Sequence, residues 1–210
     1  MFRSLVKRSL PALWVVSALV AIVAAASFAT HKTFHVEIAI PASTDAVWAV
    51  LVDTEAYPQW NPVFVEVEGA YTEGETVLNK VRDPGGAVLA MTALVETVRP
   101  GAELRQSGGI PGILTFDHRW LLESIEGGTR VAQHEVDRGI GLWFVDTDWI
   151  EPAYSAANEA LAKRVQLMAA TRKRGAARGA AVEMNDRALI PDRGQRLDHL
   201  PRRVARELGE

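Results

Sequence analysis

One stretch decides the fold of this 210-residue chain: VEIAIPASTDAVWAVLVDTEAYPQWNP, residues 36–62. Its start continues an alternation of apolar and polar residues that predicts a strand over Thr33–Ile40 with one buried face. The proline that follows ends the strand, and Ser43 or Thr44 can cap a short helix after it. In the Tyr57–Pro62 segment each proline disfavours helix for the residue before it, so we expect an aromatic turn there.

Six further strand-like runs follow, separated by breaks that contain Gly and Pro, and they predict an antiparallel meander. They are Val63–Glu68, Thr76–Arg82, Ala87–Val98, Glu103–Ser107, Ile113–Ser124 and Thr129–Arg138. From about Asp148 to Met168, apolar residues recur at three- and four-residue intervals, which predicts one long amphipathic helix. Residues 175–210 are rich in Ala, Gly, Arg and Asp with little periodicity, so we expect a loose tail with at most a short helix near His199–Leu208.

Two segments carry a resemblance to a known family: residues 36–62 and HRWLLESIEGGTRVAQHE, His118 to Glu135. Together they resemble the START-like helix-grip (SRPBCC) superfamily, in particular its polyketide cyclase/dehydrase and lipid transport group, over roughly residues 33–170. The resemblance implies an α+β fold in which a curved antiparallel sheet wraps around a long C-terminal helix. It also implies an elongated, mostly apolar cavity for lipids, sterols, polyketides or similar molecules. Such a scaffold hosts binders, carriers and some enzymes, so the ligand stays open.

An apolar leader precedes the resembling region. Residues 10–29 read LPALWVVSALVAIVAAASFA, a run without charge that is long enough to cross roughly 30 Å of hydrocarbon. Three basic residues precede the run and only Lys32 follows closely, so the positive-inside rule predicts a single-pass topology with the N-terminus inside and the domain outside. We expect a transmembrane anchor or a cleaved signal helix, the latter giving a secreted or periplasmic domain. A buried soluble helix is disfavoured because the run has no polar face.

Charge is distributed unevenly along the chain. Residues 1–32 carry four Lys/Arg and no acid, residues 33–162 carry seven against twenty acids, and residues 163–210 carry twelve against six. The boundaries that we expect are therefore a leader over 1–32, a ligand-binding domain over 33–174 and a basic tail over 175–210. The acidic domain disfavours nucleic acid as a partner, because phosphate binding needs a cationic surface. With no cysteine, five scattered histidines and no phosphate loop, the sequence predicts neither a metal nor a cofactor.

The candidate site follows from the register of a hairpin. A turn centred at Glu126-Gly127 pairs two strands so that His118 lies opposite Glu135. The side chains placed on one common face, together with Trp60 from the proline-bounded turn, form the predicted ligand-binding set: Trp60, Leu114, Phe116, His118, Trp120, Gln133 and Glu135. A mainly apolar wall with a few polar groups suits a small-molecule pocket. Ordinary core packing is the alternative, and a register slipped by two residues would place Asp137 opposite His118.

These observations favour a membrane-tethered or exported protein that holds a hydrophobic or amphipathic, lipid-like molecule in an internal cavity. One alternative is an enzyme of the polyketide cyclase or dehydratase kind that uses the same cavity. In that enzyme His118 and Glu135 would be the catalytic acid/base pair, since a neighbouring carboxylate raises the pKa of an imidazole and orients the ring. The other alternative is an adaptor module without a ligand, acting through the acidic domain and the basic tail.

Overall fold

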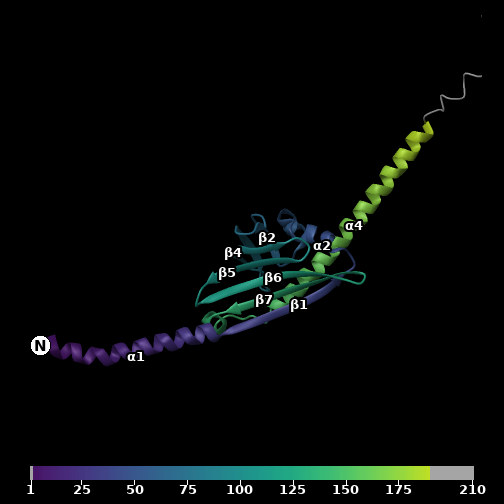
Figure 1. Cartoon of the computed structure of the whole chain (residues 1–210). Coiled ribbons are helices and arrows are strands. Elements are labelled where there is room, and N and C mark those ends of the chain that lie inside the picture. Colours follow the sequence, from purple (N-terminus) through teal and green to yellow (C-terminus); the bar gives the residue numbers. More distant parts are fainter. Residues whose placement is uncertain (1, 190–210) are drawn as a thin grey trace, which may run out of the picture. The chain divides into compact units, whose positions relative to one another are not determined.

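The fold is built on one curved antiparallel sheet of seven strands (Figure 1). This structure, a computed structural model, describes residues 2–189, with side chains for residues 14–181 and 184. The strands are β1 (His31–Ile40), β2 (Phe64–Glu68), β3 (Thr76–Arg82), β4 (Val88–Arg99), β5 (Glu103–Ile110), β6 (Leu114–Ile125) and β7 (Gly128–Arg138). Their order is β1-β7-β6-β5-β4-β3-β2. With the long helix α4 (Ile150–Leu189), this sheet confirms the expected α+β helix-grip architecture.

The hairpin between β6 and β7 sets which of its side chains share the concave face of the sheet. Gly127, in its turn, has a φ of +81°, in the left-handed region that favours glycine. The register places His118 opposite Glu135. It also places Trp120 opposite Gln133, so the predicted pairing is confirmed and the slipped register is excluded. Because side chains alternate along a strand, all four point to the same concave face.

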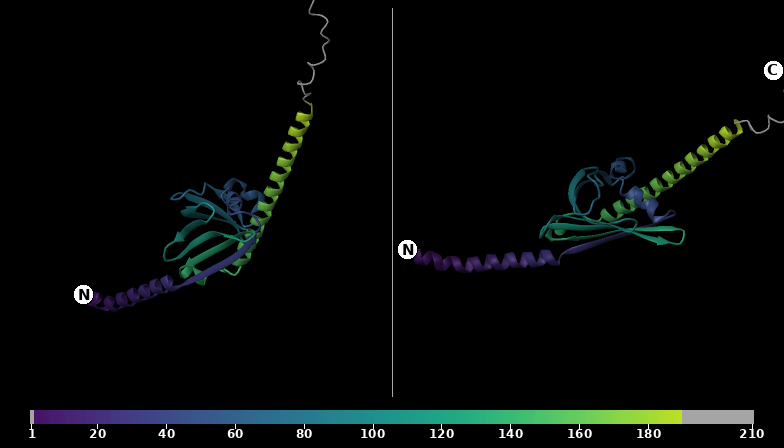
Figure 2. Two further views of the ribbon diagram at one scale, coloured as in Figure 1. Left: turned by 45° about the vertical axis from the view of Figure 1, so that its right-hand side comes forward. Right: turned by 45° about the horizontal axis from the view of Figure 1, so that its top comes forward.

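Strand β1 forms one edge of the sheet that the structure describes, and it pairs there with β7. The pairing runs from His31 opposite Arg138 to Ile40 opposite Thr129, and Figure 2 shows the two strands side by side. The hydroxyl of Thr129 also donates to the carbonyl oxygen of Ala42 at 2.7 Å, just past the end of β1. Strand β7 is therefore an interior strand, held by β6 on one side and by β1 on the other.

Short helices follow β1. They are α2 (Thr44–Leu51), the 3-10 turn η1 (Thr54–Ala56) and α3 (Tyr57–Trp60). Ser43 caps α2, because its Oγ accepts a hydrogen bond from the N–H of Ala46 at 3.3 Å. The expectation of a turn without helix over Tyr57–Pro62 is wrong for its first four residues, which form one helical turn. Pro58 is tolerated because it stands at the start of that turn, where no backbone N–H is needed.

The first part of α4 packs against the concave face of the sheet (Figure 1). Its buried side chains recur at three- and four-residue spacing, as predicted: Ile150, Tyr154, Ala157, Leu161 and Val165. Gln133 of β7 joins strand to helix. Its Nε2 donates to the carbonyl oxygen of Tyr154 at 3.0 Å and to Oδ1 of Asn158 at 2.9 Å. The helix thereby closes the open side of the curved sheet.

Beyond residue 167, α4 continues as helix to Leu189. The expectation of a loose segment from residue 175 is therefore wrong as far as residue 189. Alanine is the strongest helix former, and the alanines at 176, 177, 180 and 181 offset two glycines that cost about 1 kcal/mol each relative to alanine. The short helix expected near His199–Leu208 lies outside the described residues.

Helix α1 (Phe2–Ala29) precedes β1, and only Thr30 separates the two elements. Near its end Ser27 is buried. Its Oγ donates to the carbonyl oxygen of Gly112 and accepts from the N–H of Ile140 at 3.1 Å. Among the residues that the structure describes, no helix is long and apolar enough to cross a membrane, and the expected transmembrane helix is not supported.

Candidate functional site

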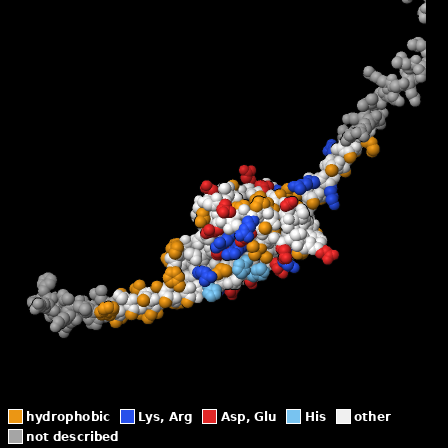
Figure 3. All heavy atoms as spheres, viewed as in Figure 1, with side chains coloured by type: hydrophobic (Ala, Val, Ile, Leu, Met, Phe, Trp, Pro, Cys, Tyr) orange, Lys and Arg blue, Asp and Glu red, His pale blue; other side chains and the backbone are white. Residues whose placement is uncertain are grey.

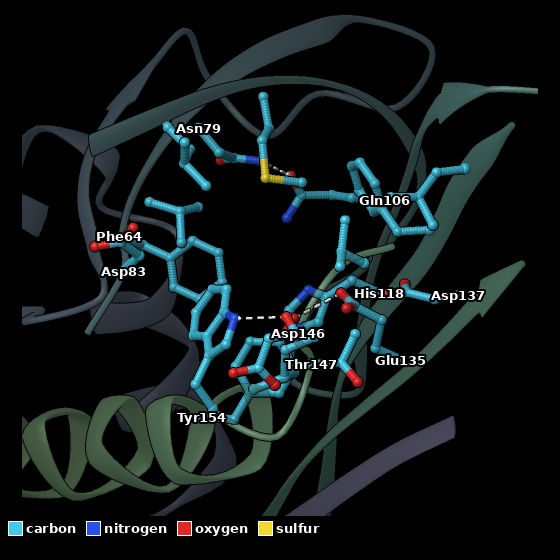
Figure 4. A pocket seen from close by; sticks show the side chains of 18 residues that line it. Phe64, Asn79, Asp83, Gln106, His118, Glu135, Asp137, Asp146, Thr147 and Tyr154 are labelled. Carbon is cyan, nitrogen blue, oxygen red and sulfur yellow. Dashed lines mark hydrogen bonds between the residues drawn. The ribbon is translucent and has the colours of Figure 1, made fainter. Parts of the chain in front are cut away.

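The concave face of the sheet and the first turns of α4 enclose a cavity of about 290 Å³, shown close up in Figure 4. Much of its wall is apolar and includes Phe64, Met91, Leu114, Phe116, Trp149 and Ile150. Polar side chains reach it from four strands: Asn79 from β3, Gln106 from β5, His118 from β6, and Glu135 and Asp137 from β7. The arrangement combines apolar area with a few hydrogen-bonding groups, which is the composition of small-molecule sites.

The structure brings four of the seven predicted ligand-binding residues into the cavity wall: Leu114, Phe116, His118 and Glu135. Trp120 and Gln133 lie on the same face but behind the wall, with 1% and 0% of their surfaces exposed. Trp60 lies elsewhere, in a separate groove beside Pro62 and the outward side of α4. The helical turn of α3 accounts for this, because it buries Tyr57 and leaves Trp60 half-exposed at the turn's other end.

His118 is a neutral imidazole held by Gln133. The amide nitrogen of Gln133 is committed to α4, so its Oε1 faces the ring and lies 3.1 Å from Nε2 of His118. Nε2 is therefore the donor, and Nδ1 is left as an acceptor. Burial lowers the pKa of His118 to about 4. The expectation that Glu135 raises this pKa is wrong, since the hydrogen-bond partner of His118 is an uncharged amide and desolvation dominates.

Glu135 and Asp137 form a buried carboxyl pair. The hydroxyl of Tyr154 donates to Oε2 of Glu135 at 2.6 Å. Burial, reinforced by the charge of Asp137, raises the pKa of Glu135 to about 8, and burial raises that of Asp137 to about 6. Oδ1 of Asp137 is buried without a hydrogen-bond partner. Around neutral pH the pair therefore retains a proton, and it stands ready to accept a further hydrogen bond.

Sequence reasoning missed the polar groups on the opposite wall. Nδ2 of Asn79 donates to Oε1 of Gln106 at 3.0 Å, both residues are buried, and Oδ1 of Asn79 has no partner. A signal was present in the sequence: Asn79 stands between Val77 and Val81, where the alternation of β3 predicts an apolar inward residue. Tyr154 was predicted as part of the apolar helix face, but nothing in the sequence placed its hydroxyl on Glu135.

Aromatic rings surround the polar end of the cavity. Phe64 stacks on Tyr154 with ring centroids 6.2 Å apart, and the ring of His118 lies 5.0 Å from that of Tyr154. Trp149, in the segment that leads into α4, donates from Nε1 to the carbonyl oxygen of Asp146 at 3.1 Å. Among the described residues no group of three or more His, Asp or Glu side chains is arranged to hold a metal ion.

Known proteins share this arrangement of sheet and helix. A family model described as polyketide cyclase / dehydrase and lipid transport matches residues 31–166 of the chain. That match covers the sheet, the cavity and the first part of α4, and it agrees with the resemblance of the two sequence segments. No curated protein matches the chain.

Solved structures share the fold at low sequence identity. A protein from Rhizobium leguminosarum is 20% identical over 65% of this chain and 95% of its own, with a TM-score of 0.53. A protein from Nitrosomonas europaea is 14% identical over 66% and 96%, with a TM-score of 0.54. DynU16, from the dynemicin biosynthetic locus, is 18% identical over 64% of this chain and 47% of its own, with a TM-score of 0.51. At these identities the likeness shows the fold alone.

Proposed function

Because the chain belongs to the polyketide cyclase/dehydrase and lipid transport family, we propose that it binds a hydrophobic or amphipathic small molecule in the cavity between the sheet and α4. The observation that carries this proposal is the cavity itself. About 290 Å³ between the sheet and the helix is left unfilled by side chains, in a protein interior that is otherwise close-packed. Apolar wall area supplies affinity at roughly 25 cal/mol per Å² of ligand surface buried, and the polar side chains orient the ligand.

The first test is extraction and identification of what the protein carries. The full chain is purified, its bound small molecules are measured by native mass spectrometry, and a solvent extract is analysed. We expect an apolar molecule at about one per chain. A chain that is free of any such molecule, and that takes up no neutral fluorophore such as N-phenylnaphthylamine, would contradict the proposal.

A matched pair of variants locates the binding in the cavity. Met91 lines the cavity, whereas Thr92, the next residue of β4, points to the opposite face of the sheet and is exposed. Met91→Trp fills part of the cavity, so we expect it to weaken N-phenylnaphthylamine binding at least tenfold. Thr92→Trp adds the same side chain outside and should bind like the natural protein. Equal binding by both variants would place the ligand elsewhere.

A second candidate function is proton transfer on a ligand held in the same cavity, as in a cyclase or dehydratase. The observation that favours it is the carboxyl of Glu135, whose burial holds its pKa near 8 and which accepts a hydrogen bond from Tyr154. A carboxyl that keeps its proton near neutral pH is suited to general acid catalysis. Glu135, not His118, would be the acid here. Turnover lost in Glu135→Gln with ligand binding retained would support an enzyme over a carrier.

We also propose that the domain is exported and tethered at a lipid surface by its leader. The uncharged run over residues 10–29 supports this, as do large apolar side chains exposed close to the end of α1: Phe28, Ile110, Ile113, Trp143 and Phe144. Nε1 of Trp143 donates to Oγ1 of Thr30, directly after α1. Cell fractionation with protease added from outside tests the proposal. A chain found in the cytosol and protected from protease would contradict it.

A further inference from the structure

The ionisable groups around the cavity have one sign. Among the described residues that line it, every side chain that can carry a charge near neutral pH is a carboxyl, and neither Lys nor Arg is present. The carboxyls are Asp83, Glu135, Asp137 and Asp146 (Figure 4). His118 adds no positive charge, since burial lowers its pKa to about 4. Any charge that the described side chains of the wall carry near neutral pH is therefore negative.

None of these four carboxyls forms an ion pair with a cation of the described residues. Asp83 and Asp146 accept hydrogen bonds from backbone N–H groups of their own loops. The ammonium group of Lys32, in β1, donates a hydrogen bond to Oγ1 of Thr147 at 2.6 Å. The negative charge of the cavity is thus not neutralised by the protein's own side chains in the part of the chain that the structure describes.

The inner pair contains an unused acceptor. Asp137 has 7% of its surface exposed, lines the cavity, and has no hydrogen-bond partner at Oδ1. A buried acceptor without a donor destabilises the protein, so a ligand that donates a hydrogen bond to this atom would gain binding free energy. Glu135, two residues away on the same face of β7, accepts a hydrogen bond from Tyr154 and shares a side-chain hydrogen bond with Asp137. A ligand group with several N–H donors would satisfy both carboxyls at once.

The rings around the pair suit the same kind of group. Phe64, Trp149 and Tyr154 line the cavity beside the carboxyls, and Phe64 stacks on Tyr154. Faces of aromatic rings attract cations, most strongly where water is excluded. An anionic head beside this pair would instead face the carboxylate of Asp137 in a buried site of low dielectric, where repulsion between like charges is strong.

From this arrangement we propose that the ligand is a cationic amphiphile: an apolar body that carries an ammonium group, held by Glu135 and Asp137 against the aromatic rings. This inference rests on the proposed binding function and adds the chemical class of the polar end. It makes fatty acids and other anionic lipids poor ligands, because the described wall contains no Lys or Arg to pair with a carboxylate or phosphate.

The test compares three probes that share one apolar chain: decylammonium, decanol and decanoate. Each displaces N-phenylnaphthylamine from the full chain held in phosphatidylcholine nanodiscs, and empty nanodiscs supply the correction for partition into lipid. We expect the ammonium probe to bind at least tenfold more tightly than decanol, and decanoate to bind more weakly than decanol. This panel needs no variant, so it is informative whether or not a variant folds.

Variants assign the preference to the pair. Glu135→Gln and Asp137→Asn should each reduce the preference for ammonium over decanol at least fivefold while decanol binding changes less than twofold. Glu55→Gln is the control, because it makes the same Glu-to-Gln substitution at an exposed residue outside the cavity wall. Decanol bound as tightly as the ammonium probe would overturn the inference and leave the proposed function standing. If none of the three probes binds, both fall.

Discussion

Carboxyl side chains on the two faces of strands β5–β7 have pKa values shifted in opposite directions. On the convex face, Asp117 of β6 accepts hydrogen bonds from Nε of Arg105 at 3.0 Å and from Nε of Arg119 at 3.1 Å. Burial alone would raise the pKa of Asp117, but the two guanidinium groups outweigh it and lower that pKa. On the concave face, Glu135 and Asp137 have no cationic partner among the described residues, and burial raises both pKa values.

The difference teaches that burial and cationic partners together set the charge of these carboxyls: burial acts to raise all three pKa values, and only Asp117 has guanidinium groups that reverse the shift. Charged side chains of both signs gather over the strands on the outer surface (Figure 3), where guanidinium groups outweigh the desolvation of Asp117. The inner surface holds its carboxyls partly protonated, which keeps hydrogen-bonding capacity available for a ligand. One surface pairs its carboxyls with cations, and the other keeps the hydrogen-bonding carboxyls that the proposed ligand would contact.

We expect the largest loss of stability from a substitution that breaks the hydrogen-bond network of the concave face. Gln133→Leu leaves the Nε2–H of His118 and Oδ1 of Asn158 without partners in a buried region. At about 1 to 3 kcal/mol for each unsatisfied group, we expect the free energy of unfolding in urea to fall by about 4 kcal/mol. His134→Leu, one residue away on the outward face, should cost less than about 1 kcal/mol. Similar losses in both variants would contradict the assignment.

The next effect is the pH dependence of the buried carboxyls. The pKa of Glu135 is raised to about 8 in the folded state, so the folded state binds the extra proton and stability is lost as pH rises toward 8. The pKa of His118 is lowered to about 4, so its contribution is lost in the other direction, as pH falls from 6.5. Above pH 6.5 only the carboxyl effect of these two remains.

We therefore expect the free energy of unfolding to fall by roughly 2 kcal/mol between pH 6.5 and 8, at up to about 1.4 kcal/mol per pH unit for one proton. Glu135→Gln keeps the shape of the side chain and cannot ionise, so its stability should be nearly flat over that range. Urea titrations at several pH values measure both. A natural protein that is equally stable at both ends of the range would refute the raised pKa.

On the convex face, replacing a carboxylate by its amide should change the free energy of unfolding with the opposite pH dependence. Asp117→Asn removes a carboxylate that stabilises the fold in its charged form, and this contribution is present above the pKa of the unfolded carboxyl and lost as pH falls through the lowered folded value. We expect a loss of about 1 kcal/mol at neutral pH. The difference from the natural protein should vanish in acid. A difference that persists below both pKa values would show that the amide disturbs packing.

The smallest expected effect is the salt dependence of stability, which should differ between the two faces of the sheet. Salt screens exposed ion pairs and leaves buried groups nearly unaffected, since the Debye length falls from about 10 Å at 0.1 M to about 3 Å at 1 M. The cost of Asp117→Asn should therefore shrink by a few tenths of a kcal/mol at high salt. The cost of Gln133→Leu should stay constant. Parallel urea titrations at the two salt concentrations provide the comparison.

The sequence predicted the frame of the site better than its chemistry. The Gly127 turn and the alternation along β6 and β7 were enough to pair His118 with Glu135 in register. The hydrogen bonds of the two residues differ from this pairing, because His118 bonds to Gln133 of the same sheet and Glu135 bonds to Tyr154 of α4. Hydrogen bonds between elements far apart in the chain leave no periodic pattern in the sequence.

Local rules also failed where neighbours outweighed them. The prolines around Trp60 suggested a loop that reaches the cavity, but a single helical turn directs this residue to another groove. The composition beyond residue 174, rich in Ala, Gly, Arg and Asp with little periodicity, suggested a loose segment, but the alanines favour helix as far as Leu189. Asn79 and Gln106 could have been found as polar residues at inward strand positions, because the amino-acid sequence itself displays that exception to the alternation.

The pairing of β1 with β7 has a consequence for how the chain is made. The first strand of the sheet has no neighbour until the last one exists, since Ile40 pairs with Thr129 and His31 with Arg138. At ribosomal rates of about 5 to 20 residues per second, β1 waits roughly 5 to 20 seconds for its partner. During that interval the chain cannot close its sheet, and the leader is already available to any machinery that recognises it. Because the pairing of β1 with β7 comes last, the segment next to the leader stays unpaired while the other strands are synthesised.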